Sequence, residues 1–474
     1  MKKLTLISVA LVFLAPLARA EETAPVPAYQ PFPQGYGYME PTEIKALQEA
    51  VHDGDHAVVR EHGWRLWAGI MQPAKGLDWP VWFTWPNTKA AFAIPPTSTL
   101  NAPPAPSLSL LQRNIRNVNI PPSELPVYPI PVQVQTSYPN ATKDCGAGVI
   151  CDGAHVLFNG DIMIPTESLS EEGFDWIRGQ RLYEKSQLDT LFAEHVHETT
   201  APQRHIVTKH MFWPVKASGL TAIPVWHEDY DVKYPGYAGY EKWKTLAAID
   251  PSGKKVGETV TVSFLYGVNE PDGKTPWPTV TGPAKVYGLD SFYHHRVTEA
   301  DWKSFDEADK AIINAASYWA YNEPFNVGDY LITVAMHVNT KEIPSWALQS
   351  VWWSDRPNEG SYAENRPTMP QAKGPWTHYL LTDAYGIPDK RSNEQPVAMN
   401  PYIELAIHPV ATNCNNCHSR AGWPTKAKIP GGPSASYQNK DCPDLLATLT
   451  PETPCLKPLT LTDFQWIIPD RAGP

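Results

Sequence analysis

Five consecutive residues near the carboxyl end, Cys414-Asn415-Asn416-Cys417-His418, bring together two thiols and an imidazole. Two intervening residues place both sulfurs on one side of a helical turn, and the next position carries the imidazole. In c-type haem attachment, two thiols at this spacing add to the porphyrin vinyl groups and the adjacent histidine ligates the iron. We therefore predict one covalent haem c on Cys414 and Cys417, with His418 as proximal ligand. A zinc site, a thiol redox centre and a structural disulfide share the Cys-x-x-Cys spacing and remain alternatives.

The amino-terminal residues have the pattern of a cleavable secretory signal. Two lysines, Lys2 and Lys3, precede a mostly apolar stretch, Leu4–Leu17, and Ala18-Arg19-Ala20 matches a cleavage signal. The apolar stretch is shorter than the roughly 20 residues of a membrane span. No cysteine follows until Cys145, so we expect no lipid anchor on the mature chain. Residues 1–20 thus predict export to a bacterial periplasm, a compartment in which haem c can be attached.

The net charge of the chain indicates which kinds of molecule it would bind poorly. The formal charge is −11, and loss of the three basic residues within 1–20 leaves 36 basic against 50 acidic residues, or −14. This excess of acidic residues argues against nucleic acid and anionic membranes as partners. It is compatible with a basic redox partner protein.

The remaining cysteines indicate the same compartment. Apart from the motif pair, the sequence contains Cys145, Cys151, Cys442 and Cys455, which fall into two local pairs. Disulfides persist in oxidising compartments, so we predict Cys145–Cys151 and Cys442–Cys455. Other pairings, and free buried thiols, remain open.

Composition predicts the architecture of the rest of the chain. Proline accounts for 49 of 474 residues, and there are 18 tryptophans; proline disfavours long helices and central strands. We expect a mixed fold: a β-rich, sandwich-like body rich in Pro and Trp over residues 21–394, with peripheral helices, and a C-terminal c-type haem segment, residues 395–474, packed on it. Residues 21–40 and 86–135, which are Pro-rich and lack periodicity, are expected to form a loose arm and a long surface crossing.

Three runs read as strands and three as helices. The expected strands are Val260–Val268, Tyr330–Val338 and Ala347–Trp353, the last two forming a hairpin around residues 339–345. The expected helices are Glu43–His62, Glu171–His195 and Glu299–Ala320, where Thr298 can cap a first turn that contains Glu299 and Asp301.

The second axial position of the predicted haem has no obvious ligand. The 56 residues after His418 contain neither Met nor His, so such a ligand must come from upstream. We expect His337, at the turn end of the predicted hairpin, to be the ligand or to reach a bound molecule, with Met399 and Met369 as competitors. Met336 would face the other side of the strand. Alternatively, the sixth position is empty or is taken by water, Lys or Asn.

The residues around His337 also admit a purely structural role. His337 can cap the hairpin turn or bond Glu342, and Lys341 can hold a haem propionate or be a solvated turn residue. Other histidines are weaker candidates. His195 and His197, flanked by Glu194 and Glu198, and His52 and His56, beside Asp53 and Asp55, have spacings that permit a metal. His205 and His210 are expected at a strand end packed by aromatic rings.

Three sequence blocks give the chain a resemblance to a known group. They are Trp64-Arg65-Leu66-Trp67 with Trp79-Pro80-Val81-Trp82; His337-Val338-Asn339-Thr340-Lys341 followed by Trp346, Trp352 and Trp353; and Asn400-Pro401-Tyr402-Ile403-Glu404 before the haem motif. In these the chain resembles the large secreted monohaem cytochrome c family proteins of proteobacteria, with Leu348 where that group often has a second Trp. The resemblance implies haem and an exported compartment, but no reaction.

Two classes of function follow. The first is a periplasmic c-type cytochrome that transfers electrons to a redox partner. The second is a haem enzyme or small-molecule sensor with an open or displaceable distal site, which the length of the chain and the missing downstream ligand favour. A Trp-lined binding protein that carries haem is a third, weaker interpretation.

Overall fold

The computed structural model describes residues 28–77, 79–94, 120, 122–141, 143–144, 150–151, 156–157, 164–227, 230–231, 233–264, 267–405, 408–437 and 439–473. The predicted signal peptide and the predicted Cys145–Cys151 pairing lie outside the side chains described, and most of the Pro-rich stretch 86–135 lies outside the described residues. Within the described residues, no helix is both long enough and apolar enough to cross a membrane.

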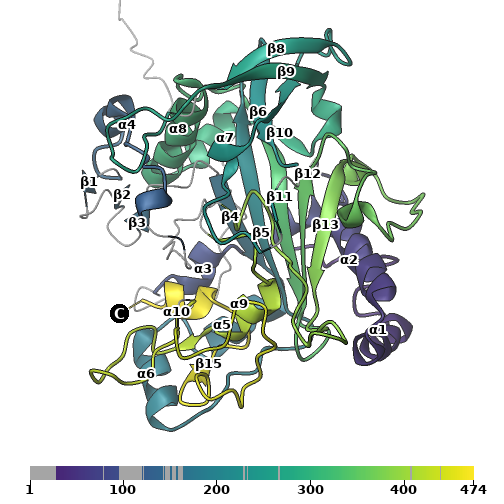
Figure 1. The fold of residues 1–474 in the computed structure, drawn as a ribbon, viewed down its shortest axis with the longest axis vertical. Coiled ribbons are helices and arrows are strands. Elements are labelled where there is room, and N and C mark those ends of the chain that lie inside the picture. The colour runs from purple at the N-terminus through teal and green to yellow at the C-terminus, as the bar shows by residue number, and fades with distance from the viewer. Residues whose placement is uncertain are drawn as a thin grey trace, which may run out of the picture.

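An antiparallel sheet forms the centre of the molecule (Figure 1). Its strand order is β13-β12-β11-β5-β4, and β10 pairs with the first part of β11. The strands are β4 (Ile164–Leu169), β5 (Ile206–Val215), β10 (His294–Arg296), β11 (Tyr330–Thr340), β12 (Ala347–Trp353) and β13 (Tyr379–Ala384). Strands β4, β12 and β13 are buried over almost their whole length, so both faces of this sheet are covered.

Smaller sheets surround it. A four-stranded sheet lies at one end of the molecule (Figure 1), with β7 and β9 parallel. It consists of β6 (Thr221–Val225), β7 (Thr245–Ile249), β8 (Thr259–Phe264) and β9 (Val280–Tyr287), in the order β6-β7-β9-β8. The short strands are β1 (Lys143–Asp144), β2 (Ile150–Cys151), β3 (Val156–Leu157), β14 (Gly422–Trp423) and β15 (Thr460–Leu461).

Most helices are short and peripheral. They are α1 (Pro41–Asp53), α2 (His56–Ile70), α3 (Thr88–Phe92), α4 (Val132–Ser137), α5 (Glu171–Gly179), α6 (Lys185–Ala193), α7 (Glu299–Ser304), α8 (Glu307–Tyr321), α9 (Cys414–Ser419) and α10 (Ile467–Arg471). The prediction of a mixed, β-rich body with helices is therefore confirmed at that level.

Each of the three predicted helical runs is a pair of helices. Gly54, in the left-handed conformation at φ 71°, ends α1, and the side chain of Asp55 then caps α2. Arg181, at φ 57°, lies between α5 and α6. Thr298 caps α7 as predicted, with Asp301 completing a capping box, but Asp306 starts a second box at α8. The predicted strand ranges are close: β12 has the predicted limits, whereas β11 continues to Thr340 and β8 ends at Phe264.

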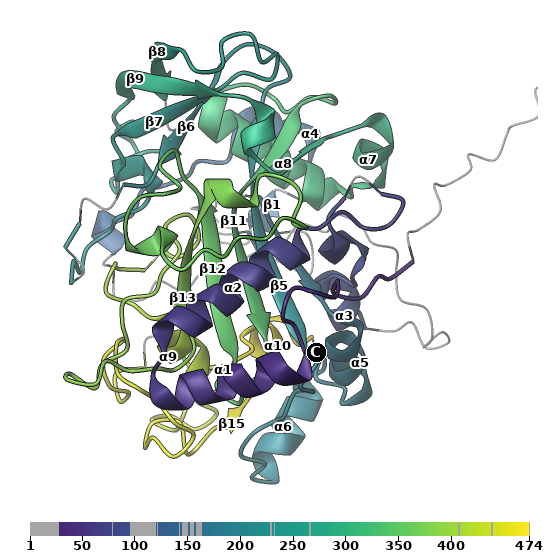
Figure 2. The same cartoon turned by 90° about the vertical axis from the view of Figure 1, so that its right-hand side faces the viewer.

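The two faces of the central sheet carry different segments. The residues on one face include His210, Met336, Val351 and Leu381, which are register partners across β5, β11, β12 and β13. Helix α2 packs there, since a Cβ on Gly63 would lie 3.4 Å from Leu381. Figure 2 shows α1 and α2 crossing these strands.

The opposite face carries the carboxyl-terminal part of the chain. Its residues include Lys209, His337, Ser350 and Thr382, again in register. The side chain of Asn400 donates to the Ser350 hydroxyl at 2.7 Å and to the Val351 carbonyl oxygen at 2.8 Å. The segment that contains the Cys-x-x-Cys-His motif therefore begins on the face opposite to the amino-terminal helices.

The described part of the expected loose arm is packed. Phe32 and Tyr36 are buried in the main core, and the Gln30 carbonyl oxygen accepts a hydrogen bond from the Trp85 indole at 2.7 Å. The Met39 amide donates to Glu342 at 2.8 Å. The expectation of a loose arm is therefore wrong for residues 28–40, because aromatic side chains anchor this Pro-rich stretch.

Candidate functional site

The motif forms the short helix α9, whose first turn is fixed by Asn413. The Asn413 side chain accepts hydrogen bonds from the amides of Asn415 and Asn416, at 2.8 and 3.1 Å, and donates to the Pro396 carbonyl oxygen at 2.8 Å. An asparagine at the N-cap supplies the acceptor that the first helical amides lack. The residue before the motif therefore sets the direction in which the two cysteines and the histidine project.

The two residues between the cysteines attach α9 to the rest of the chain. Asn415 donates to the Ser345 carbonyl oxygen in the turn between β11 and β12, at 3.0 Å. Asn416, fully buried, donates to the carbonyl oxygens of Asp444 and Ala447 at 3.0 and 2.7 Å. Buried polar groups are costly unless bonded, so these contacts hold the helix in one place.

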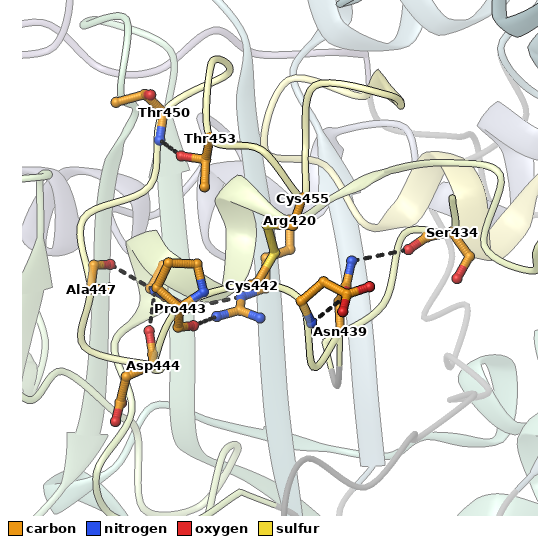
Figure 3. Close-up of a disulfide and its surroundings, with 12 residues drawn as sticks. Arg420, Ser434, Asn439, Cys442, Pro443, Asp444, Ala447, Thr450, Thr453 and Cys455 are labelled. Carbon is orange, nitrogen blue, oxygen red and sulfur yellow. Dashed lines mark hydrogen bonds between the residues drawn. A yellow bond between two sulfur atoms is a disulfide. The ribbon is translucent and has the colours of Figure 1, made fainter. Parts of the chain in front are cut away.

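A loop closed by a disulfide supports the other side of α9 (Figure 3). Cys442 and Cys455 are joined, as predicted. The buried Arg420 donates to the Pro443 carbonyl oxygen beside this disulfide, at 2.7 Å, and to the Asn416 side chain, at 3.1 Å. Burial lowers the pKa of Arg420.

His418 has one ring nitrogen fixed by the backbone. Its Nδ1 lies 2.6 Å from the Phe464 carbonyl oxygen. A carbonyl oxygen only accepts, so Nδ1 carries the proton and Nε2 keeps its lone pair. Burial, partly offset by this hydrogen bond, lowers the pKa of His418 to about 4, so the ring is neutral near pH 7. A neutral imidazole whose Nδ1–H is bonded to the protein is the form in which histidine ligates metals.

Of the two cysteines of the motif, Cys414 lies in surroundings that differ from those of a reactive thiol. Both are half-buried and outside any disulfide. The Cys414 sulfur lies 3.2 Å from the Ala398 carbonyl oxygen and packs against a cluster that includes Leu348 and Ala384 on the sheet. Burial raises the pKa of the Cys414 thiol well above its usual range, whereas a redox-active cysteine needs a stabilised thiolate.

A zinc site also lacks support among the described residues, where no group of three or more His, Cys, Asp or Glu side chains is placed to hold a metal ion. Tetrahedral zinc needs such a group. Haem c needs two thiols and one axial imidazole from this segment, and these are present. The short helix α9 thus holds the donors that a haem c would take from this segment.

His337 lies on the sheet near the motif but both of its ring nitrogens are engaged. Nδ1 lies 2.6 Å from the Ser350 hydroxyl and Nε2 lies 2.9 Å from the Glu404 carboxylate. The alternative pairing with Glu342 is wrong: that carboxylate bonds His62 at 3.1 Å. Since β11 continues three residues beyond His337, a cap on the turn is also excluded.

The His337–Glu404 pair forms a buried polar centre. Burial on its own would raise the pKa of Glu404, but the charge and hydrogen bond of His337, together with the Asn400 amide, lower it to about 2. The charges of His337, Glu404 and Lys209 all act on His418. Charged groups from three chain segments therefore influence the imidazole of the motif, although Nε2 of His337 would have to leave Glu404 to ligate iron.

The competing methionines are placed less favourably. Met399 follows Ala398, whose carbonyl oxygen meets Cys414, but the Met399 side chain belongs to the main core cluster rather than to the one that contains Cys414. Met369 also packs in the main core, and nearby Lys373 bonds Gln72 just beyond α2, on the far side of the sheet. Met336 is fully buried on the α2 face, opposite to His337.

The other histidines considered as metal ligands lie exposed on helices, in a loop or among buried aromatic rings. His52 is an exposed partner of Asp53 on α1, separated from His56 on α2 by the break at Gly54. His195 and His197 lie in the loop after α6 and not on a strand. His205 and His210 are fully buried beside Trp346 and Trp82, and burial lowers the pKa of each to about 3.

The expectation that Lys341 is a solvated turn residue is wrong, because Lys341 forms a buried ion pair; its alternative role, holding a haem propionate, stays a prediction. Its ammonium lies 2.7 Å from Asp463, whose side chain is fully buried. Sequence reasoning did not single out three residues of this site: Asp463, Phe464 and Ser350. Asn400 and Glu404 could have been found from the sequence, because both belong to one of the three blocks that carry the family resemblance.

Comparison of the chain with protein-family models, with curated proteins and with solved structures finds no match.

Proposed function

We propose that this protein is a c-type cytochrome that carries one haem on Cys414 and Cys417, with His418 as the proximal ligand. The observation that carries the proposal is the bond between His418 Nδ1 and the Phe464 carbonyl oxygen, which leaves Nε2 as a metal donor on the same short helix as two thiols. The bound haem supplies a reversible one-electron change at iron. The chain supplies the attachment, the imidazole orientation and the surrounding charges.

Electron transfer in an exported, periplasm-like compartment is the role we assign to this haem. The signal-like amino terminus and the Cys442–Cys455 disulfide support export. The excess of acidic residues supports a basic redox partner protein, which would associate faster at low salt. Slower association with such a partner as salt rises is the kinetic signature to look for.

The contacts of the three candidate distal ligands favour a second function, that of a haem enzyme or small-molecule sensor. His337 uses both ring nitrogens, and the side chains of Met399 and Met369 pack in the main core. If none of them rearranges, the sixth iron position stays open or holds a displaceable molecule, as in a haem enzyme or a small-molecule sensor. His337 would then bond a molecule on the iron instead of ligating it.

The absorption spectrum of the purified protein, oxidised and reduced, separates the two functions. A low-spin spectrum that carbon monoxide does not alter supports electron transfer. A high-spin spectrum, or ready binding of carbon monoxide, supports the open site. The same spectra for His337→Ala, Met399→Ala and Met369→Ala assign the distal residue, and an unchanged spectrum and unchanged carbon monoxide binding in His337→Ala would remove His337 from the site.

A further inference from the structure

A buried ion pair joins the carboxyl-terminal segment to the hairpin of the central sheet. The Lys341 ammonium, at the end of β11, lies 2.7 Å from Oδ1 of Asp463, and the side chains are 12% and 0% exposed. The Trp346 indole donates to the same oxygen at 2.9 Å, and the Ala201 amide donates to the other carboxylate oxygen at 2.8 Å. Asp463 is thus bonded by two residues of the hairpin turn and one residue of the loop before β5.

The residue after Asp463 is the one that contacts the proximal histidine. The Phe464 carbonyl oxygen accepts the His418 Nδ1 proton at 2.6 Å. Asp463 and Phe464 are both in the left-handed region, at φ 47° and 65°. Two consecutive non-glycine residues rarely adopt this conformation unless their surroundings impose it. The bonds to the Asp463 carboxylate anchor the first of these two residues.

We propose that Lys341 and Asp463 are positioning residues for the proximal ligand: their buried pair fixes the 463–464 turn, and the turn aims the Phe464 carbonyl oxygen at His418 Nδ1. The inference rests on the proposed function, since it assigns the pair a role in tuning the haem. A strong Nδ1–H bond makes an imidazole a better donor to iron. This donation stabilises the oxidised iron, so weakening the bond raises the reduction potential.

The test compares substitutions of the pair in the haem-loaded protein. Asp463→Asn and Lys341→Met remove one charge each at similar volume, and Lys341→Arg keeps the charge. Lys45→Met is the matched control, because Lys45 forms an exposed pair with Glu49 on α1, on the far side of the sheet. The measurements are the reduction potential, hydrogen exchange of the His418 Nδ1 proton by nitrogen NMR, and the urea midpoint of unfolding.

We expect Asp463→Asn and Lys341→Met to raise the potential and to accelerate exchange of the His418 proton, with Lys341→Arg close to the unmodified protein and Lys45→Met unchanged. An unchanged potential and unchanged exchange, alongside a lower urea midpoint, would overturn the proposal and leave the pair a structural contact. If Asp463→Asn does not accumulate, the comparison of Lys341→Met with Lys341→Arg decides.

The failure of this inference can be told apart from the failure of the proposed function. A protein without covalent haem would refute the proposed function, yet the exchange of the His418 Nδ1 proton remains measurable in it. Slow exchange that depends on Lys341 would then support the positioning role. Exchange that does not respond to Lys341→Met would refute it.

Discussion

Replacing Asn416 by Ala tests whether the residues between the two cysteines hold the haem motif on the body of the protein. The Asn416 side chain is fully buried and makes three hydrogen bonds, to the carbonyl oxygens of Asp444 and Ala447 and from the Arg420 guanidinium. The substitution leaves Cys414, Cys417 and His418 in place. Haem attachment should therefore be retained while the stability falls.

The size of the loss follows from the groups left without a partner. Arg420 is 2% exposed, so its Nε would remain buried and charged without the Asn416 oxygen, at a cost of about 1.5 to 3 kcal/mol. The two carbonyl oxygens add about 1 kcal/mol each at most. We expect the free energy of unfolding to fall by about 1.5 to 5 kcal/mol, a substantial part of the stability of a typical protein.

The assay is urea unfolding of the haem-loaded protein, followed by tryptophan fluorescence and extrapolated to water. Asn439→Ala is the control: Asn439 lies three residues before the disulfide-bonded Cys442 (Figure 3) and is half-buried. Its side chain donates to the Ser434 carbonyl oxygen at 3.4 Å and accepts from the Asp441 amide at 3.0 Å. Its loss should be about 1 kcal/mol. A loss in Asn416→Ala no greater than in Asn439→Ala would refute the idea that the motif itself fastens the segment.

Three further outcomes are expected for residues other than those of the haem motif. Burial raises the pKa of Glu241 to about 8 from 4.5. The unfolded chain therefore loses this proton at lower pH than the folded protein, and the free energy of unfolding falls as pH rises from about 4.5 to 8. Because Gln does not titrate, the stability of Glu241→Gln should rise relative to that of the unmodified protein across this range, by up to about 5 kcal/mol. Gly173→Ala should destabilise α5, because its Cβ would lie 2.1 Å from His205, which is fully buried; we expect a loss of about 1 to 3 kcal/mol. Replacing Cys442 and Cys455 together by Ala should cost about 2 to 4 kcal/mol.

Each of these outcomes has a clear contrary result in urea unfolding. Parallel pH profiles for Glu241→Gln and the unmodified protein would show that Glu241 does not titrate in this range. An unchanged midpoint in Gly173→Ala would mean that the contact of α5 with His205 is looser than the structure has it. Equal stability of the double cysteine variant and the disulfide-bonded protein would mean that the loop is held by other contacts.

The sequence was most informative where local rules decide the outcome. The run Ala347–Trp353 has β-branched and aromatic residues and forms a strand with those limits, and Thr298 caps a helix as its spacing with Asp301 indicates. The helix breaks at Gly54 and Asp306 were also visible in principle, as a C-terminal glycine and an N-terminal aspartate. Hydrophobic periodicity alone joined helices that these residues separate.

The site was harder to predict, because its contacts join distant parts of the chain. Lys341 and Asp463 are 122 positions apart, and His337 meets Glu404 only because the chain after β13 returns across one face of the sheet. Strand register decides that His337 and Ser350 share that face. A motif identifies Cys414, Cys417 and His418, but side chains that meet through the path of the chain leave no local pattern.

The intact mass of the protein, purified from a bacterial host that attaches haem c, tests the central claim most directly. We predict the mass of the chain without residues 1–20 plus one haem that survives denaturation, and loss of that haem when Cys414 and Cys417 are both replaced by Ala. An unmodified mass for the unsubstituted protein, from a host that loads haem on a control cytochrome c, would contradict the account.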